Sequence, residues 1–294
     1  MVINFAKTSG IILKCLGGLY TVESPDGIFE CKARGVFRNM GISPSVGDSV
    51  IVENGVISEI GDRKNFLIRP PLANLDCIIF IVSTVSPSPN FLILDKFIAI
   101  AEYKKIEPVV IITKTDLGNS SPIHEIYDSI GIKVLEIDYN DESSVQAVRE
   151  LLRGKISAFT GNSGAGKSTL LNAVDSSLNI PTGEISKKLG RGKHTTRHAE
   201  LYRLADGGYI ADTPGFSTFE TNRYDIIRKE ELAGCFREFY GLTENCRFRD
   251  CSHTCEKGCA VIDAVDNGDI PKMRHESYCA MYNEAKQLKE WELK

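Results

Sequence analysis

GNSGAGKS, residues 161–168, has the spacing GxxxxGK[ST] of a phosphate-binding loop. In such a loop, glycines allow backbone N–H groups to converge on phosphate oxygens. Residues 156–160 before it predict a strand, and residues 167–174 after it predict a helix. Because a strand, this loop and a helix in that order form a nucleotide phosphate site, the 294-residue chain is predicted to bind a nucleoside triphosphate.

Two side chains of this loop have specific predicted roles. Lys167 brings a positive charge to the β- and γ-phosphates, where it also assists hydrolysis, and the Ser168 hydroxyl ligates the Mg²⁺ that accompanies the nucleotide. The residues expected to contact the nucleotide here are Gly161, Asn162, Ser163, Gly164, Ala165, Gly166, Lys167, Ser168 and Thr169.

Outward from the loop, short apolar segments alternate with segments of helical periodicity. This alternation predicts a parallel sheet covered by helices on both faces. The predicted strands are 76–82, 108–113, 133–137 and 156–160, and the predicted helices are 92–103, 123–130, 145–152 and 167–174.

TKTD, residues 113–116, ends the second of these strands and resembles the NKxD motif of GTPases. Asp116 is predicted to accept hydrogen bonds from guanine N1–H and the exocyclic amine, which adenine cannot offer. The stem of Lys114 is expected to pack over the base. Residues Thr113, Lys114, Thr115 and Asp116 are therefore predicted to select GTP over ATP.

DTPG, residues 212–215, follows a predicted strand at 209–211 and matches the motif DxxG. Asp212 is expected to hold Mg²⁺ through water, and the Gly215 N–H to sense the γ-phosphate. Upstream, GRGKHTTR at 190–197 offers Thr195 or Thr196 as the threonine that caps Mg²⁺.

The order of the motifs is itself informative. In ordinary GTPases the phosphate loop comes first, whereas here the base motif at 113–116 precedes the loop at 161–168. The site uses only strand ends, so one parallel sheet can be assembled with either connectivity. The sequence predicts a circularly permuted GTPase domain whose DxxG motif lies at its C-terminal exit.

Residues 9–63 predict a separate small β-barrel. Five short β-rich segments at 11–16, 18–23, 28–33, 49–52 and 56–60 are separated by Gly, Asn and Asp turn signals. An OB-fold is the leading interpretation and an SH3-like barrel the alternative. Residues 63–72, with two adjacent prolines, are expected to form a linker.

The last 70 or so residues contain a cysteine cluster between helical segments, the final one predicted at 272–291. Cys246, Cys251, His253 and Cys259 offer three thiolates and an imidazole, the donor set of a structural zinc site. Cys255 could replace His253 in a four-cysteine set. The cysteines of the N-terminal half, Cys15, Cys31 and Cys77, are expected to be buried free thiols.

The amino-acid composition restricts the partners and location of the protein but does not indicate a function. The formal net charge is -4, so any nucleic-acid surface must be a local patch. No stretch approaches the roughly 20 apolar residues of a membrane span, and residues 1–10 lack the features of a signal peptide. We expect a cytoplasmic, monomeric protein with no membrane partner.

The combined motifs resemble one family closely, the RsgA (YjeQ) circularly permuted GTPases. The resemblance is carried by the small barrel, the motif order, GRGKHTTR at 190–197, DTPGF at 212–216 and CRFRDCSHTCEKGCAV at 246–261. It implies an OB-fold RNA-binding domain at 1–64, a permuted GTPase domain at 65–220 and a mostly helical zinc-binding domain at 221–294. It also implies a role in late maturation of the small ribosomal subunit, with hydrolysis of GTP to GDP stimulated by that subunit and its RNA.

The chain departs from the family pattern at three places, and from many other GTPases at a fourth. Thr113 stands where Asn is usual, no Ser-Ala base-contacting motif is visible at 137–140, and Cys255 stands where His is more frequent. Phe216 follows DxxG, where many GTPases carry a glutamine that orients the attacking water. Since Phe cannot orient water, His194 is the predicted catalytic group.

Two other classes of function are compatible with the sequence. A small-molecule kinase or ATPase could use the same loop, although TKTD and the lack of a recognisable acceptor site argue against it. An RNA-binding module that uses nucleotide only as a switch is supported by the barrel, the cysteine-rich segment and a basic run. That run comprises Lys187, Lys188, Arg191, Lys193 and Arg197.

Overall fold

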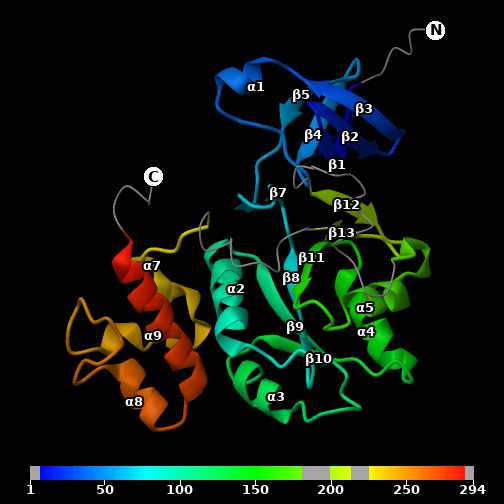
Figure 1. Ribbon diagram of the computed structural model, residues 1–294. Coiled ribbons are helices and arrows are strands. Elements are labelled where there is room, and N and C mark those ends of the chain that lie inside the picture. The colour runs from blue at the N-terminus through cyan, green and yellow to red at the C-terminus, as the bar shows by residue number, and fades with distance from the viewer. Residues whose placement is uncertain (1–6, 181–198, 213–224, 289–294) are drawn as a thin grey trace.

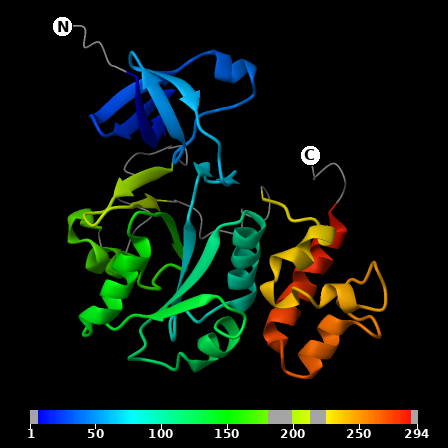
Figure 2. The ribbon, with the colours of Figure 1, turned by 180° about the vertical axis from the view of Figure 1, so that it is seen from behind.

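The computed structural model describes residues 7–180, 199–212 and 225–288 (Figure 1). A small β-barrel stands above a central sheet flanked by helices, and a helical C-terminal part lies beside the sheet's α2 side (Figures 1 and 2). The predicted succession of barrel, α/β sheet and C-terminal helices is confirmed.

Within the described residues, five parallel strands form the central sheet, and a sixth runs antiparallel to them. The strand order is β10-β9-β8-β11-β13-β12. The strands are β8 (Cys77–Ser83), β9 (Glu107–Thr113), β10 (Lys133–Glu136), β11 (Ile156–Gly161), β12 (Glu200–Arg203) and β13 (Tyr209–Asp212). The sequence pattern missed β12, because four residues without a long apolar run carry little signal. It pairs antiparallel with β13, so the predicted all-parallel sheet is corrected at this strand.

Helices cover both faces of the sheet, as predicted. Alternate residues of β8 and β9 enter two different cores: Phe80 and Val110 pack with α2 and α3, whereas Ile79 and Ile111 pack with α4 and α5. Burial on both faces explains why these strands are continuously apolar. The helices are α2 (Phe91–Tyr103), α3 (Ser121–Tyr127), α4 (Glu142–Leu152) and α5 (Lys167–Val174), and a short 3-10 turn, η1 (Ser176–Leu178), follows α5.

The N-terminal barrel closes in the order β1-β2-β3-β5-β4, with β4 returning to β1. This five-stranded closed arrangement is the OB-fold rather than the SH3-like alternative. Ile12, Val22, Val50 and Ile57 fill its core. Its elements are β1 (Thr8–Leu16), β2 (Leu19–Ser24), β3 (Gly27–Ala33), α1 (Val36–Asn39), β4 (Ser49–Glu53) and β5 (Val56–Ile60).

The segment expected as a plain linker has structure of its own. Strands β6 (Phe66–Leu67) and β7 (Leu72–Ala73) pair antiparallel. The Asn65 side-chain amide donates to the Leu75 carbonyl at 2.8 Å and accepts from the Leu75 N–H at 2.9 Å. These buried hydrogen bonds fix the chain between barrel and sheet, which composition alone did not indicate.

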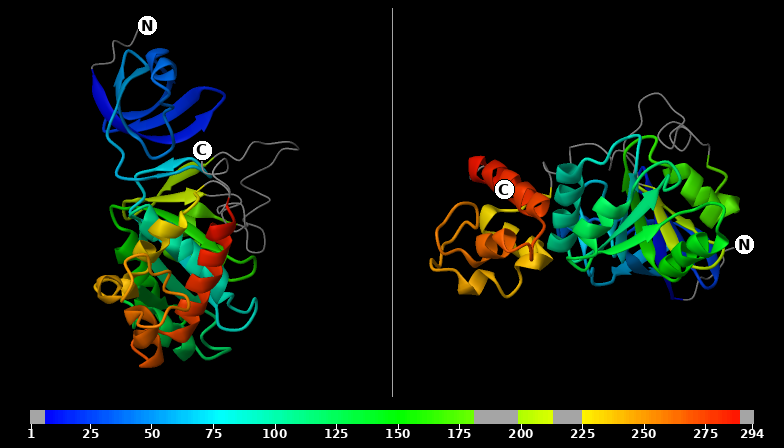
Figure 3. Two further views of the ribbon diagram at one scale, coloured as in Figure 1. Left: turned by 90° about the vertical axis from the view of Figure 1, so that its left-hand side faces the viewer. Right: turned by 90° about the horizontal axis from the view of Figure 1, so that it is seen from below.

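The C-terminal part consists of short helical turns and two longer helices. These are α7 (Lys229–Leu232), η3 (Ala233–Cys235), η4 (Arg237–Phe239), η5 (Thr243–Asn245), α8 (Ala260–Asp266) and α9 (Lys272–Gln287). Helix α9 begins where predicted but ends at Gln287, not at 291, because Leu288 has extended backbone. It packs against α2 of the central domain (Figure 3).

A buried ionic network joins these two helices. The Arg274 guanidinium of α9 pairs with Asp95 of α2 at 2.6 Å and with Glu238 at 2.7 Å. The Tyr127 hydroxyl donates to the same Asp95 carboxylate at 2.9 Å. All three charged side chains are nearly inaccessible to water, so the C-terminal part is fixed to the central domain by a specific polar contact. Among the described helices, none has the length and apolarity to cross a membrane.

Candidate nucleotide-binding site and metal cluster

The phosphate loop begins at the end of β11 and leads directly into α5, as the motif predicts. Gly161, Gly164 and Gly166 adopt φ values of 153°, 83° and 98°, a region that favours glycine. A Cβ at Gly161 would lie 2.5 Å from the Ile81 carbonyl oxygen. The loop backbone therefore requires these glycines.

Lys167 and Ser168 are the first residues of α5. The Leu170 N–H bonds to the Gly166 carbonyl at 2.9 Å, which closes the first turn of the helix. Amides ahead of that bond point out of a helix N-terminus, where they favour anions. Ser168 is buried at the base of the loop, so its hydroxyl is suitably placed to meet a cation held by phosphates.

The base motif lies against the phosphate loop, although 52 residues separate Thr113 from Ala165. The Thr113 hydroxyl donates to the Ala165 carbonyl at 2.6 Å. The Lys114 ammonium donates to the Gly164 carbonyl at 2.9 Å and also to the Ser86 carbonyl. The sequence predicts the Lys114 stem over the base, and in the structure the Lys114 ammonium contacts the phosphate loop.

Asp116 is exposed beyond this contact, where a base could reach its carboxylate. The neighbouring Thr115 hydroxyl donates to the Ile137 carbonyl at 3.3 Å, and the Ile137 N–H donates to the Ile112 carbonyl at 2.9 Å. Ile137 therefore lies beside the base motif. The sequence of 137–140 has no recognisable signal, and these hydrogen bonds together with the parallel pairing of β9 and β10 reveal the position.

Asp212 is the last residue of β13, which pairs in parallel with β11. Since parallel strands end at one edge of a sheet, the Asp212 backbone lies at the edge that carries the phosphate loop. The structure thus brings together the backbones of 113–116, 161–168 and 212. The predicted residues His194, Thr195, Thr196 and Gly215 lie outside the described residues.

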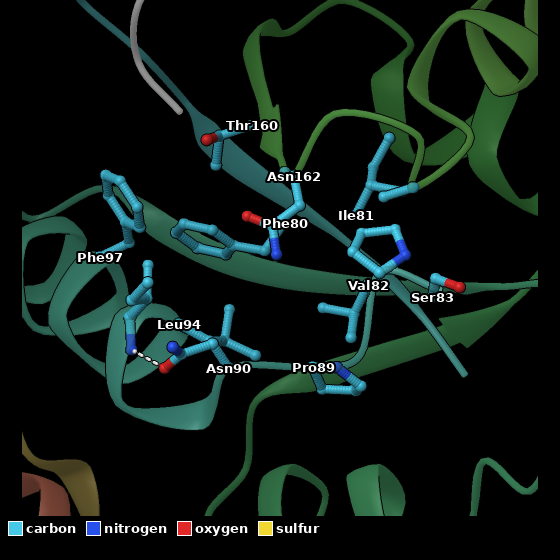
Figure 4. A pocket seen from close by; sticks show the side chains of 14 residues that line it. Phe80, Ile81, Val82, Ser83, Pro89, Asn90, Leu94, Phe97, Thr160 and Asn162 are labelled. Carbon is cyan, nitrogen blue, oxygen red and sulfur yellow. Dashed lines mark hydrogen bonds between the residues drawn. The ribbon is translucent and has the colours of Figure 1, made fainter. Parts of the chain in front are cut away.

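An apolar pocket adjoins the phosphate loop on the α2 face of the sheet (Figure 4). Phe80, Val82, Leu94 and Phe97 line it, and Asn162 of the loop reaches its rim. The Asn90 side chain caps α2 by accepting from the Ile93 N–H at 3.1 Å. With no charged side chain in its lining, this pocket is unsuited to phosphate, so the nucleotide is expected at the loop itself.

The cysteine cluster converges as its spacing predicts. Ligand atoms of Cys246, Cys251, His253 and Cys259 lie within 4.8 Å of one another. His253 Nδ1 is 3.5 Å from the sulfurs of both Cys246 and Cys259. Cys255 is exposed and stands outside this cluster. The geometry therefore brings in His253, and not Cys255, as the fourth donor.

The chemistry of these donors fits a metal cation. Burial lowers the pKa of His253, which favours the neutral imidazole that a metal binds. Burial also raises the pKa of Cys251 to about 12, and the adjacent thiols add to this effect. Thiolates crowded in this way require a cation nearby. Behind the cluster, His275 Nε2 donates to the His253 carbonyl at 2.7 Å and supports the loop.

The other cysteines only partly match their expected burial. Cys31 and Cys77 are buried, as predicted, whereas Cys15 is half-buried. Burial raises the pKa of the Cys31 thiol, so this group behaves as a small apolar side chain.

A phosphate loop bonded to a TKTD motif that precedes it in the chain defines a P-loop GTPase of circularly permuted order. The family model for the RsgA GTPase matches residues 60–222, and that for the RsgA N-terminal domain matches residues 9–57. The chain belongs to the RsgA family of GTPases.

Relatives match along nearly the whole chain. A small ribosomal subunit biogenesis GTPase RsgA of Geobacillus kaustophilus is 43% identical over 291 residues, covering 95% of this chain and 98% of the relative. The protein of that name from Caldanaerobacter subterraneus is 43% identical, covering 96% and 97%. The crystal structure of YjeQ from Thermotoga maritima superposes with a TM-score of 0.82 at 34% identity, covering 97% and 100%. YloQ, a circularly permuted GTPase, gives 0.79 at 33%, covering 98% of each chain.

Proposed function

We propose that this GTPase binds the small ribosomal subunit and its RNA, and assists late maturation of the subunit. In this role it hydrolyses GTP to GDP and phosphate, and the subunit stimulates the reaction. The observation that carries the proposal is the match of barrel, permuted GTPase domain and C-terminal part to relatives named for small-subunit biogenesis. The domain limits 1–64, 65–220 and 221–294, a monomeric state and a cytoplasmic location belong to the same proposal.

In this proposal the described residues bind and orient the nucleotide. The loop 161–169 binds the phosphates, Lys167 neutralises their charge, and Asp116 selects guanine. Bound Mg²⁺ would supply charge neutralisation between the phosphates, with Ser168 as its ligand. The contacts of Thr113 and Lys114 with the loop support a preformed site, since they hold its backbone in place before a nucleotide arrives.

Asp212, together with residues outside the described ranges, completes the proposed chemistry. Thr195 or Thr196 would cap Mg²⁺, Asp212 would contact it through water, and the Gly215 N–H would contact the γ-phosphate. His194 would place the attacking water, because Phe216 cannot. Hydrolysis by the free protein is therefore expected to be slow.

The cluster of Cys246, Cys251, His253 and Cys259 is proposed to hold one structural zinc ion. Four protein donors leave no open coordination position, which suits a structural rather than a catalytic site. The donor-bearing residues 246–259 contain no helix or strand, so the metal would stabilise their fold.

The deciding experiment measures GTP and ATP hydrolysis with isolated small subunits, with large subunits and with neither. GTP turnover accelerated by small subunits alone supports the proposal. Equal use of ATP would favour the kinase or ATPase class, and unaltered turnover despite tight subunit binding would favour an RNA-binding switch. His194→Ala should retain nucleotide and subunit binding but lose most stimulated turnover, whereas Lys167→Ala should weaken nucleotide binding itself.

A further inference from the structure

The barrel and the central domain share one continuous sheet. Strand β1 of the barrel pairs antiparallel with β12, with Lys14 opposite Glu200, so the joint lies on the β12–β13 hairpin. The Lys14 ammonium also binds the Glu200 carboxylate at 3.0 Å. This hairpin is thus held from the barrel side by backbone pairing and by an ion pair.

Glu23 of the barrel makes a second contact with the same hairpin. One of its carboxylate oxygens accepts from the Arg203 guanidinium at 2.7 Å, and the other from the Tyr209 hydroxyl at 2.5 Å. Arg203 of β12 and Tyr209 of β13 are register partners, so the Glu23 carboxylate forms hydrogen bonds with both strands. The Glu23 side chain is only 11% exposed, and partial exclusion of water strengthens such a charge-assisted contact.

The hairpin lies between the two motifs predicted to respond to the γ-phosphate. Thr195 and Thr196 precede β12 in the sequence, and Asp212 ends β13. Glu200 is the register partner of Asp212. Lys14 of the barrel therefore contacts the residue directly opposite Asp212, while Glu23 fixes the other end of the hairpin.

We infer that Glu23 is a positioning residue for the subunit-stimulated step of GTP hydrolysis, which acts through the β12–β13 hairpin on the placement of Asp212. The inference rests on the proposed function, because its consequence is that a barrel docked on the small subunit places the hairpin for catalysis. Neither Glu23 nor Arg203 belongs to the phosphate loop or to the base motif, so their effect is on the chemical step and not on nucleotide affinity.

The test compares the full-length parent with Glu23→Gln, Arg203→Glu and the exchanged pair Glu23→Arg/Arg203→Glu. Glutamine is similar in size to Glu23 and can still accept from Tyr209, but it loses the ion pair. The matched control is Glu53→Gln, which removes a barrel carboxylate paired with Arg34 at 3.1 Å and away from the hairpin. Steady-state GTP turnover is measured with and without small subunits, together with subunit co-sedimentation and the melting temperature.

We expect Glu23→Gln and Arg203→Glu to lower subunit-stimulated kcat by about tenfold. This change corresponds to an increase of about 1.4 kcal/mol in the activation free energy of hydrolysis. Basal turnover, the KM for GTP and co-sedimentation should stay at parental values. The exchanged pair should recover most of the stimulation, which a loss of stability alone would not produce. Glu53→Gln should match the parent.

Parental stimulation in Glu23→Gln, or failure of the exchanged pair to recover it, would overturn the inference while leaving the proposed function intact. A fall in basal turnover equal to the fall in stimulated turnover would also overturn it, since the contact would then serve folding only. If small subunits fail to stimulate the parent chain, the proposed function itself is wrong, and the inference falls with it.

Discussion

The Thr113 hydroxyl donates a 2.6 Å hydrogen bond to the carbonyl oxygen of Ala165, and both residues are buried. Thr113 ends β9, whereas Ala165 belongs to the phosphate loop. The bond therefore joins the base-reading and phosphate-binding parts of the site across the permuted connectivity. Asn is usual at this position of the motif, so Thr113 shows how a shorter side chain can still tie the two parts together.

Thr113→Val should loosen the phosphate loop. Valine has the shape of threonine but cannot donate, so the Ala165 carbonyl is left without its buried partner, at a cost of about 1–3 kcal/mol. We expect the free energy of unfolding to fall by this amount and the affinity for GTP and GDP to fall together, as measured by denaturant unfolding and nucleotide titration. Thr115→Val is the control, because its hydroxyl bonds to Ile137 and not to the loop; equal losses in the two variants would contradict this role.

Asp116→Asn should change which base the protein prefers. An asparagine amide can donate where the carboxylate only accepts, so xanthine, with a carbonyl in place of the exocyclic amine, becomes the better partner. Competition between GTP, xanthosine triphosphate and ATP for the parent and the variant measures the change. A parent chain that binds GTP and ATP equally would show that Asp116 does not read the base.

Much of the site could be predicted because its signals are local. The glycines of 161–166 are required by the loop backbone itself, and α5 spans 167–174 as the pattern indicates. The spacing of Cys246, Cys251 and Cys259 likewise marked the metal cluster. Choosing between His253 and Cys255 needed the structure, because loop geometry and not spacing decides which side chain faces the cluster.

The remaining features depend on partners far away in the sequence. Lys114 bonds to a carbonyl 50 residues later, and Glu23 to a side chain 180 residues later. No periodicity or motif records such contacts, since they arise when the strands pair. Strand β12 was missed for the same reason: pairing with β1 and β13 stabilises it, and its own four residues supply little β propensity.

His124 should make stability depend on pH near neutrality. Hydrogen bonding to Asp128, and then to Glu136, raises the pKa of His124 above 6.5 against the effect of burial. A group whose pKa is higher in the folded state than in the unfolded state stabilises the protein at pH values below its unfolded-state pKa. This contribution disappears as the pH rises through the folded-state pKa. We therefore expect His124→Gln to be less stable than the parent at about pH 6 and nearly equal at about pH 9. A stability difference that grows with pH would contradict this sign.

Arg274→Met should be strongly destabilising although it introduces an apolar residue in the interior. It leaves Asp95 and Glu238 buried without their cation, which costs about 3–5 kcal/mol in comparable cases. Because Asp95 lies on α2 and Arg274 on α9, loss of the network should also loosen the C-terminal part. Proteolysis between the central domain and the C-terminal part should then be faster. Lys272→Met on the same helix is the control, since Lys272 is 82% exposed; similar melting temperatures for both variants would rule out a structural role for the network.

Removal of the metal should unfold the C-terminal segment while sparing the barrel and the central sheet. The four donors come from the 14 residues 246–259, which contain no helix or strand, so little but the metal can hold them together. Purified protein should contain one zinc ion per chain, with Zn–S distances of about 2.3 Å by X-ray absorption. A strong chelator should then abolish the slow amide exchange of α8 and α9, which pack behind the cluster.

The zinc content of single-substitution variants should show which side chains bind the metal. His253→Ala and Cys259→Ala should each lower zinc content, because a thiolate or an imidazole is lost from a closed four-donor set. Cys255→Ser should retain full zinc, since this thiol is exposed and outside the cluster. If His253→Ala keeps its zinc and loses it only when Cys255 is also changed, Cys255 replaces the imidazole in solution. Stoichiometric zinc in a variant that lacks both Cys246 and Cys251 would refute the whole ligand set, because the two remaining donors cannot hold a structural ion.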